Sequence, residues 1–475
     1  MRRAMMIDLD KCIGCQACVT SCKERWDIGP GAVRDWVHEF EHTDDEGGIG
    51  ITFYPGLCMQ CEDHPCTEDC PTGATYMDKN SGVVMVDSQV CIGCGNCISK
   101  CAYEARRIDE KKGIVEKCNL CAPYVDRGEE PACVTTCLAN CRHFGDLDAP
   151  DGNFASLVKS SGAKPLVTEE VNIRPKVTFS GDNHRKQILA KGVVKRPIPS
   201  QLTKVWTGFT RPLVSYLVPA AMGLTVLGGL LLNFKNRKQR IAPETRSAPK
   251  KTLPRHRAGM RFIHWFNLLS WILLLLTGIG LMSSESFALF GRAFPQWLAR
   301  TTGGKAPLLL FHVIWGIFWA FVIIPIFLVY KRWGIKALRE IRITGDDINW
   351  LRIKPLKMLS LTDKPLPQQD KYNAGQKLFA AAVLAGTIAI VVTGFIMAFH
   401  LGSPELIEAS IVIHKLAVAL TLIGVAVHVT MAAILREERP ALKSMVVGEI
   451  DYNHAIDHNS KWVKEMDSPA TGGKQ

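Results

Sequence analysis

Sixteen of the seventeen cysteines fall into four groups of four, and each group has the spacing of an iron–sulfur ligand set. The groups are Cys12, Cys15, Cys18 and Cys22; Cys58, Cys61, Cys66 and Cys70; Cys91, Cys94, Cys97 and Cys101; and Cys118, Cys121, Cys133 and Cys137. A C-x-x-C-x-x-C turn supplies three ligands to one cubane cluster, and in two-cluster ferredoxins the fourth cysteine binds the other cluster. The four groups therefore predict four 4Fe-4S clusters in two dicluster modules, and a protein that carries electrons.

Other uses of these cysteines fit the spacing less well. A disulfide framework belongs to oxidised, secreted chains, whereas dense C-x-x-C-x-x-C runs are typical of metal sites. Structural zinc takes two C-x-x-C pairs and does not need a triplet followed by a fourth cysteine. Cys141 is left over, and we expect it to be a small buried thiol.

The composition changes along the chain, from a polar head rich in cysteine and glycine to long apolar runs. A helix needs about 20 apolar residues to cross a bilayer. Five segments are long enough, at residues 213–234, 262–282, 308–330, 378–399 and 411–435. The sequence therefore predicts a membrane protein with a cluster-bearing head.

The formal charge of +12 is concentrated in two loops, which argues against a nucleic-acid partner. Residues 235–261 hold ten Lys or Arg and residues 331–377 hold eleven, against three in 283–307 and no Lys or Arg in 400–410. Positive residues gather on the cytoplasmic side. We therefore expect an inner-membrane protein with its C-terminus in the cytoplasm and its head in the periplasm.

The N-terminus does not carry the apolar run of a signal peptide after Arg2 and Arg3. A periplasmic head with clusters must then cross the membrane folded. We expect it to be exported together with a partner that bears a twin-arginine signal.

Short alternating stretches such as residues 82–87 predict strands that lead into the next cysteine loop. Gly14, Gly93 and Gly95 allow the backbone to wrap closely around a cluster. The expected head is a double ferredoxin-like α+β domain over residues 1–155. Residues 156–210 have few large apolar side chains and are expected to form an extended arm and a linker.

Residues 1 to about 180 resemble the four-cluster electron-transfer subunits of the molybdopterin oxidoreductases. The resemblance is carried by Lys11 to Cys18, by Cys66 to Ala74, by Cys91 to Cys94 and by His143 to Asp146. In that family the first cysteine group pairs with the fourth, and the second with the third. The resemblance implies four ligand sets: Cys12, Cys15, Cys18 and Cys137; Cys22, Cys118, Cys121 and Cys133; Cys58, Cys61, Cys66 and Cys101; and Cys70, Cys91, Cys94 and Cys97.

Four histidines lie in the apolar segments, where ionisable side chains are candidates for function. His414 and His428 are fourteen residues apart, so they share one helix face about 21 Å apart. The alternating directions of the segments match His264 in depth with His428, and His312 with His414. This predicts two bis-histidine haems of type b, whereas the alternative is four interhelical hydrogen bonds.

Residues 255 to about 450 resemble the cytochrome b subunit of formate dehydrogenase, with relatives in thiosulfate reductase and nickel–iron hydrogenase. The motifs are Arg261 to Trp265, Phe311 and His312, Lys371 to Lys377, and His414 with His428. The resemblance implies the same haem pairs and a quinone site, for menaquinone or ubiquinone, at Asn373, Gly375 and Gln376. Taken alone, this turn is also explained by Asn373 capping the next helix.

The predicted order of domains is the head, the arm, an anchor helix at 211–240, a four-helix cytochrome b domain at 251–450 and a polar tail at 451–475. We expect an electron conduit between an outer molybdopterin catalytic subunit and membrane quinone, most like formate dehydrogenase. The alternatives are a thiosulfate or polysulfide reductase type running from quinol, or a hydrogenase-linked subunit. A membrane redox sensor would need an output domain that the short tail does not supply. Substrate catalysis is expected in the partner, and a higher oligomer is left open.

Overall fold

The computed structural model describes residues 1–475 except for 44–46, 150, 197–200, 240–250, 283–290, 292, 330 and 468–475. The chain divides into two compact units: Met1–Arg211, Ile279–Leu309 and Ile396–Ile411 form the first, and Pro212–Gly278, Leu310–Phe395 and Val412–Gln475 form the second. Parts of the predicted linker, anchor, two loops and tail, and the end of the third apolar segment at Tyr330, lie outside the described residues.

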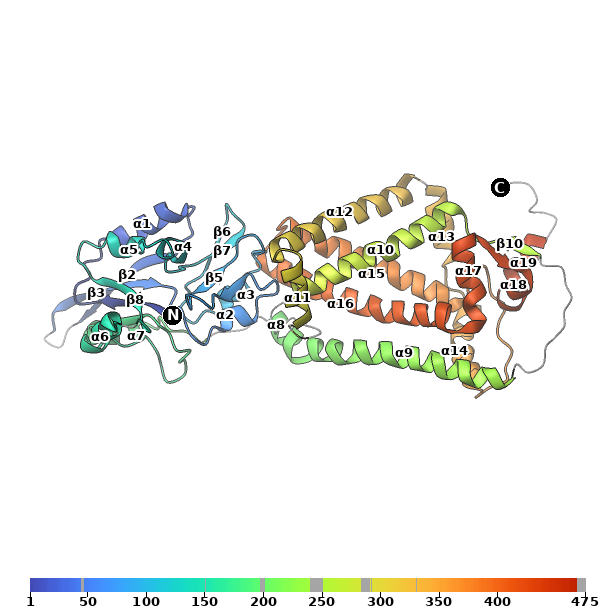
Figure 1. Ribbon diagram of the computed structural model, residues 1–475, viewed down its shortest axis with the longest axis horizontal. Helices are drawn as coiled ribbons and strands as arrows, with labels where there is room; N and C mark the ends of the chain where they lie inside the picture. Colours follow the sequence, from blue (N-terminus) through green and yellow to red (C-terminus); the bar gives the residue numbers. More distant parts are fainter. Residues whose placement is uncertain are drawn as a thin grey trace. The chain divides into compact units, whose positions relative to one another are not determined.

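A three-stranded sheet in the head joins segments that are far apart in the sequence (Figure 1). Its central strand is β1 (Arg3–Asp8), which pairs antiparallel with β8 (Arg142–Asp146) and parallel with β9 (Thr178–Ser180). Side chains alternate between the two faces of a strand. Met5 and Ile7 are fully buried in the main core on one face, whereas Ala4 and Met6 pack with Phe154 on the other. The apolar run therefore forms a strand that is covered on both faces.

Three hairpins form the other strands in the described part of the head, and each leads into a cysteine loop. They are β2 (Asp35–Thr43) with β3 (Ile49–Leu57), β4 (Thr75–Met77) with β5 (Val84–Val86), and β6 (Arg107–Asp109) with β7 (Ile114–Glu116). Short helices follow in the loops: α1 (Ala17–Trp26), α2 (Pro65–Glu68), α3 (Asn96–Ser99), α4 (Ala122–Val125) and α5 (Ala132–Thr135). This alternation is the predicted ferredoxin-like pattern, in which a strand precedes each cysteine group.

The segment expected to be an extended arm differs from that expectation. It contains strand β9 and the helices α6 (Asn153–Ser160), α7 (Asp182–Ala190) and α8 (Gln201–Val205). Phe179 and Ile188 are fully buried in the head core. Backbone hydrogen bonds between β9 and β1 hold this segment on the head, so only a few apolar side chains are needed. Because these apolar residues are sparse, the sequence shows no helix or strand periodicity here.

Among the residues that the structure describes, five helices are long and apolar enough to cross a membrane, as predicted. They are α9 (Arg211–Gln239), α10 (Ala258–Leu281), α12 (Lys305–Val329), α15 (Ala374–Ala398) and α16 (Pro404–Val429). Their outward side chains include Leu224, Phe321 and Leu420, each about two thirds exposed. Large apolar side chains that remain exposed on a bundle of long helices are what contact with lipid requires.

The remaining helices lie outside the predicted crossings. They are α11 (Ala293–Thr301), α13 (Lys331–Glu340), α14 (Gly345–Met358), α17 (Arg439–Val447), α18 (Tyr452–His458) and α19 (Ser460–Asp467). Strand β10 (Thr252–Pro254) pairs with β11 (Glu449–Asp451), and a small core forms around Leu253, Ala455 and Trp462. The start of the expected polar tail is therefore folded against the segment that precedes α10.

Candidate iron–sulfur and haem sites

The head brings together the cysteines of two ligand sets around two cavities. The first cavity is lined by Cys12, Cys15, Cys18 and Cys137, which we call site A. The second is lined by Cys58, Cys61, Cys66 and Cys101, which we call site C. In each cavity three cysteines come from one sequence group and the fourth comes from another, which is the division of ligands found in two-cluster ferredoxins.

The other two sets also lie together. Site B consists of Cys22, Cys118, Cys121 and Cys133, and site D of Cys70, Cys91, Cys94 and Cys97. Burial raises the pKa of the Cys22 thiol, and the nearby thiols of Cys118 and Cys133 add to this effect. Burial likewise raises the pKa of Cys94, with Cys70 as the next largest cause. All seventeen cysteines of the chain are free of disulfides.

Each site contains a backbone N–H that donates to a cysteine sulfur, at Ala105, Leu120, Thr75 and Cys141. The acceptors are Cys101 at 3.3 Å, Cys118 at 3.4 Å, Cys70 at 3.4 Å and Cys137 at 3.3 Å. Such donors stabilise the negative charge of a thiolate, so the four sites fit thiolate-bound clusters.

Glycine is required at two turns of the cysteine loops. A Cβ atom on Gly14 would lie 2.3 Å from the ring of Phe53, and one on Gly93 would lie 2.4 Å from the carbonyl oxygen of Gly113. Both residues also have positive φ, at 68° and 60°. The loops can therefore close around sites A and D only with glycine at these positions.

Sites A and C each contain a fully buried arginine that the sequence alone does not single out. Arg106 donates from Nη2 to Cys66 Sγ at 2.9 Å and from Nη1 to Thr75 Oγ1 at 3.3 Å. Arg142 donates from Nη2 to Cys18 Sγ at 3.4 Å and forms an ion pair with Asp35 at 2.8 Å. The charge of Arg142 is thus balanced by a carboxylate, whereas the contacts of Arg106 are a hydroxyl and a thiol.

Cys141 is buried, as predicted, but it belongs to the wall of site A. Its Sγ atom lies 3.4 Å from Cys137 Sγ, and it lines the same cavity. The position follows from β8, which begins one residue later and pairs with β1. Sequence spacing could not reveal this contact because it depends on how the strand is paired.

Site D lies against membrane-helix ends that belong to the same compact unit. Lys305, the first residue of α12, donates to the carbonyl oxygens of Thr72 and Gly73, each at 3.2 Å. Ala306 and Leu309 pack on the buried cluster that contains Cys70. The loop of site D therefore packs directly on the first turn of α12.

His312 and His414 each have a threonine partner on the neighbouring helix. His312 Nδ1 lies 2.8 Å from Thr277 Oγ1, and His414 Nδ1 lies 2.9 Å from Thr393 Oγ1. Each threonine hydroxyl donates its own hydrogen to a carbonyl, of Leu273 at 2.8 Å and of Ala389 at 2.6 Å. The hydroxyl oxygens must therefore accept from Nδ1–H, which leaves the Nε2 lone pairs available for a metal.

His264 and His428 face each other across α10 and α16. Their ring centroids are 6.4 Å apart, and Phe379 stacks on His428 with its ring centroid at 4.4 Å. An iron atom between two imidazoles, at about 2 Å from each nitrogen, places the ring centroids about 6 Å apart. The spacing therefore fits an ion held between these two rings.

The turn before α15 is built as a helix cap. Asn373 Oδ1 accepts from the Gln376 backbone N–H at 2.9 Å, and Gln376 Oε1 accepts from the Asn373 backbone N–H at 3.1 Å. This reciprocal pair is the geometry of a capping box. Gly375 follows the cap, and an added Cβ atom would lie 3.4 Å from Asn373 Oδ1. The capping alternative therefore describes the contacts of Asn373 and Gln376.

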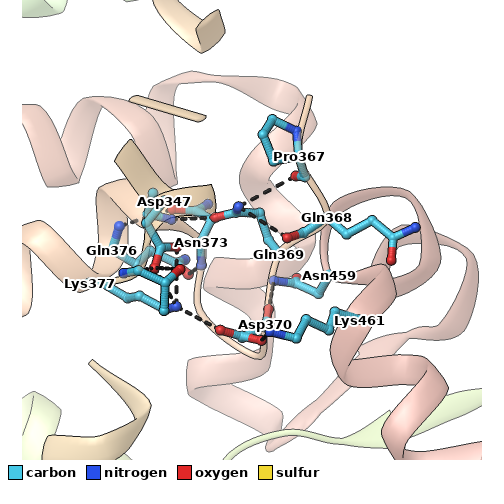
Figure 2. Close-up of polar contacts among 12 residues, drawn as sticks. Asp347, Pro367, Gln368, Gln369, Asp370, Asn373, Gln376, Lys377, Asn459 and Lys461 are labelled. Atoms are coloured by element: carbon cyan, nitrogen blue, oxygen red, sulfur yellow. Dashed lines mark hydrogen bonds and ion pairs between the residues drawn. The ribbon is translucent and has the colours of Figure 1, made fainter. Parts of the chain in front are cut away.

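A buried ion-pair network fixes this turn (Figure 2). Lys377 Nζ lies 2.9 Å from Asp347 Oδ2 of α14 and 2.7 Å from Asp370 Oδ2, and both Lys377 and Asp347 are almost fully buried. Burial alone would raise the pKa of Asp347, but the hydrogen bonds from Lys377 and Thr344 lower it below the ordinary value. Asn459, which lies between α18 and α19, donates to the carbonyl oxygen of Asp370, and Lys461 of α19 forms an ion pair with the Asp370 carboxylate (Figure 2).

His256 lies beside this turn, although its place near the end of an apolar segment predicts only an interfacial residue. Its ring stacks on Tyr372 with the centroids 6.0 Å apart. Burial lowers the pKa of His256 to about 3, and the charges of Arg255 and Lys371 act in the same direction. Its Nδ1 atom is buried and has no hydrogen-bond partner among the described residues. A neutral imidazole with a buried free nitrogen can bind a ligand carbonyl or hydroxyl.

Comparison with protein families divides the chain into the same two parts, a cysteine-rich head and a helical membrane part. Residues 255–448 match the family model of prokaryotic cytochrome b561. Residues 49–147 match a 4Fe-4S dicluster domain and residues 3–24 match a 4Fe-4S binding domain.

The head is also similar to individual curated proteins. The B subunit of sulfite dehydrogenase from Allochromatium vinosum is 38% identical over 35% of this chain and 78% of its own length. The B component of polysulfide reductase from Wolinella succinogenes is 36% identical over 36% of this chain and 91% of its own length. The thiosulfate reductase electron transfer subunit PhsB of Salmonella typhi is 38% identical over 30% of this chain and 76% of its own length.

These matches, together with the cysteine sites, define an iron–sulfur electron-transfer protein that continues into a membrane cytochrome. The protein belongs to the family of iron–sulfur B subunits of the molybdopterin oxidoreductases and carries in addition a C-terminal cytochrome b561 domain. The relatives named above are subunits of enzymes of sulfur compounds, and formate dehydrogenase is not among them, so the sequence-based preference for a formate dehydrogenase type is not supported.

Proposed function

We propose that this chain carries electrons between a molybdopterin catalytic subunit and the quinone pool through four 4Fe-4S clusters and two haems b. The observation that carries the proposal is the gathering of cysteines from different sequence groups around single cavities, as at sites A and C. Each cluster, when bound, accepts and releases one electron. Iron and sulfide analysis of the full-length protein tests the cluster number, because four clusters and two haems require about 18 iron atoms per chain.

The cysteine ligand sets are proposed as sites A to D. Exchange of one ligand by serine should affect one cluster and leave the other three. Electron paramagnetic resonance of Cys101→Ser should show the loss or change of the cluster that also uses Cys58, Cys61 and Cys66. A change in the cluster of Cys91, Cys94 and Cys97 instead would contradict the exchange of the fourth cysteine between sites C and D.

The two haem ligand pairs are proposed as His264 with His428 and His312 with His414. The first pair is supported by the 6.4 Å spacing of the rings, and the second by the two threonines that leave Nε2 free on both histidines.

For the quinone site we propose a pocket around His256 and Tyr372, next to the predicted turn at Asn373, Gly375 and Gln376. The support is the Nδ1 atom of His256, which is buried and has no partner among the described residues. The side-chain oxygens of Asn373 and Gln376, by contrast, already accept backbone hydrogen bonds. His256→Gln should slow the reoxidation of the reduced haems by a quinone analogue while the haem spectrum is kept. Unchanged reoxidation would place the site elsewhere.

The catalytic partner is proposed to act on a sulfur compound, the alternative that the sequence leaves open beside formate. The support is the similarity of the head to subunits of sulfite, polysulfide and thiosulfate enzymes. The complex should be isolated with its large subunit, and haem oxidation by thiosulfate or polysulfide or haem reduction by sulfite should be followed. Haem reduction by formate, with no response to the sulfur compounds, would refute this assignment.

The topology is proposed from the distribution of charge, with the head in the periplasm and the C-terminus in the cytoplasm. The support is the excess of Lys and Arg in residues 235–261 and 331–377. Protease added to intact spheroplasts should cleave the head. Cleavage of the head only in inverted vesicles would reverse the orientation and remove the need for a twin-arginine partner.

A further inference from the structure

Three metal-ligating side chains lie together in the second unit, outside the proposed clusters and haems. They are Glu438, just before α17, and His454 and His458 of α18, and one ligand atom of each lies within 4.8 Å of the other two. Residues four apart share one face of a helix. The two imidazole rings are stacked, with their centroids 4.2 Å apart, so one ring must rotate for both to bind the same ion in their planes.

The hydrogen bonding of His458 indicates which nitrogen is free. His458 Nδ1 lies 3.1 Å from the carbonyl oxygen of His454. Since a carbonyl can only accept, Nδ1 carries the hydrogen, and in the neutral ring the lone pair is on Nε2. This is the arrangement in which metal-binding histidines are held by a backbone carbonyl.

The free nitrogen points at a carboxylate rather than at a donor. His458 Nε2 lies 4.0 Å from Glu438 Oε1. This distance is too long for a hydrogen bond. Two ligands of a tetrahedral zinc ion lie about 3.4 Å apart, so these two atoms would move closer by about 0.6 Å when the ion binds. A lone pair and a carboxylate oxygen repel each other, and a cation between them, either a proton or a metal ion, removes the repulsion.

We propose that Glu438, His454 and His458 form a binding site for one Zn²⁺ ion. Two imidazoles and one carboxylate are the ligands of a borderline metal and not of Mg²⁺ or Ca²⁺, which take six or more oxygens. His458 keeps 29% of its side-chain surface exposed, so water can occupy a fourth coordination position. The positive charge of Arg255 acts on His454 and opposes cation binding, and the Glu438 carboxylate offsets it.

Zinc at this site would join the segment after α16 to α18. The next residue, Asn459, donates to the carbonyl oxygen of Asp370 at 2.6 Å. The ion would therefore stabilise the C-terminal helices against the loop that precedes α15. This role is independent of the proposed electron transfer.

The test is zinc binding by the full-length protein in detergent, with His454→Ala, His458→Ala and Glu438→Gln as variants. His184→Ala, which changes a histidine of the head, is the matched control. After dialysis against Zn²⁺, the wild type and the control should retain one zinc per chain with nitrogen and oxygen neighbours at about 2.0 to 2.1 Å in X-ray absorption. Each site variant should bind at least tenfold more weakly.

Two results would overturn the proposal. One is zinc with sulfur neighbours at about 2.3 Å, because it would show that the ion occupies the cysteine sites. The other is equal zinc affinity of the site variants and the control. The haem spectrum shows whether each variant is folded, and Glu438→Gln tests the site if a histidine variant fails to fold.

Discussion

Arg106→Gln should lower the reduction potential of the cluster proposed at site C and, to a smaller extent, that of the cluster proposed at site D. Arg106 is fully buried and lies 2.9 Å from Cys66 Sγ, so its positive charge favours the added electron. Glutamine keeps a hydrogen-bond donor but removes the charge. Arg106 also acts on the Cys97 thiol of site D, so that cluster should shift less, whereas the clusters at sites A and B should keep their potentials.

The size of the shift follows from Coulomb's law. With about 6 Å between the guanidinium and the centre of the added charge, and an effective dielectric constant of about 20, the interaction is about 3 kcal/mol. Since about 1.4 kcal/mol corresponds to a tenfold change, and this to about 59 mV for one electron, the potential should fall by about 120 mV. Water that enters the cavity in the variant would reduce the shift.

The assay is a redox titration followed by electron paramagnetic resonance, with all four cluster signals fitted together. Arg106→Lys keeps the charge and should leave the potential within about 30 mV of the wild type. Arg107→Gln removes the same charge one residue away, where the side chain is exposed, and should have little effect. If no cluster shifts in Arg106→Gln while all four are present, the electrostatic reasoning is wrong.

Three further predictions test the membrane half. Thr277→Val and Thr393→Val should each lower the binding affinity for the same haem by about 10- to 100-fold, because each removes the acceptor of a histidine Nδ1–H. Difference spectra should show that the other haem is intact. Loss of different haems in the two variants would contradict the pairing. Because the pKa of Asp347 is lowered in the folded protein, its ionised form stabilises the fold above the unfolded pKa of about 3.9, and this stability is lost as the pH falls through the folded pKa. Thermal unfolding between about pH 6 and pH 3 should therefore show a steeper fall of the midpoint temperature with falling pH in the wild type than in Asp347→Asn. Asn373→Ala should cost about 1 kcal/mol of stability through the lost cap, measured by thermal unfolding, and an unchanged midpoint would argue against the capping role.

The cysteine groups, the strand before each group and the five apolar helices could be predicted because their signals are local. Ligand spacing and hydropathy are read within about 20 residues of sequence. Glycines at the cysteine turns were predictable for the same reason, and Gly14 and Gly93 occupy positions where a side chain would collide.

The partners of these groups could not be predicted, because they come from other parts of the chain. Arg142 reaches Cys18 from a strand more than a hundred residues away, and Arg106 reaches Cys66 of α2 from the position just before β6. Thr277 and Thr393 look like small packing residues in the sequence, whereas the structure uses their hydroxyls as acceptors for histidine. Strand pairing and contacts between neighbouring helices decide these roles, and neither produces a periodic pattern in the sequence.

At the turn that contains Asn373, residues that stabilise the turn must be distinguished from residues that contact a ligand. Its side-chain oxygen is used by the cap, and Lys377 joins the same turn to Asp347 of α14. A substitution at Asn373 would therefore loosen the support of Tyr372 and His256, and the proposed quinone turnover would fall even without a contact between Asn373 and quinone. His256 has the buried Nδ1 atom without a partner among the described residues. A defect in His256→Gln with unchanged stability would identify a direct contact, whereas a defect in Asn373→Ala accompanied by lower stability would identify only the support.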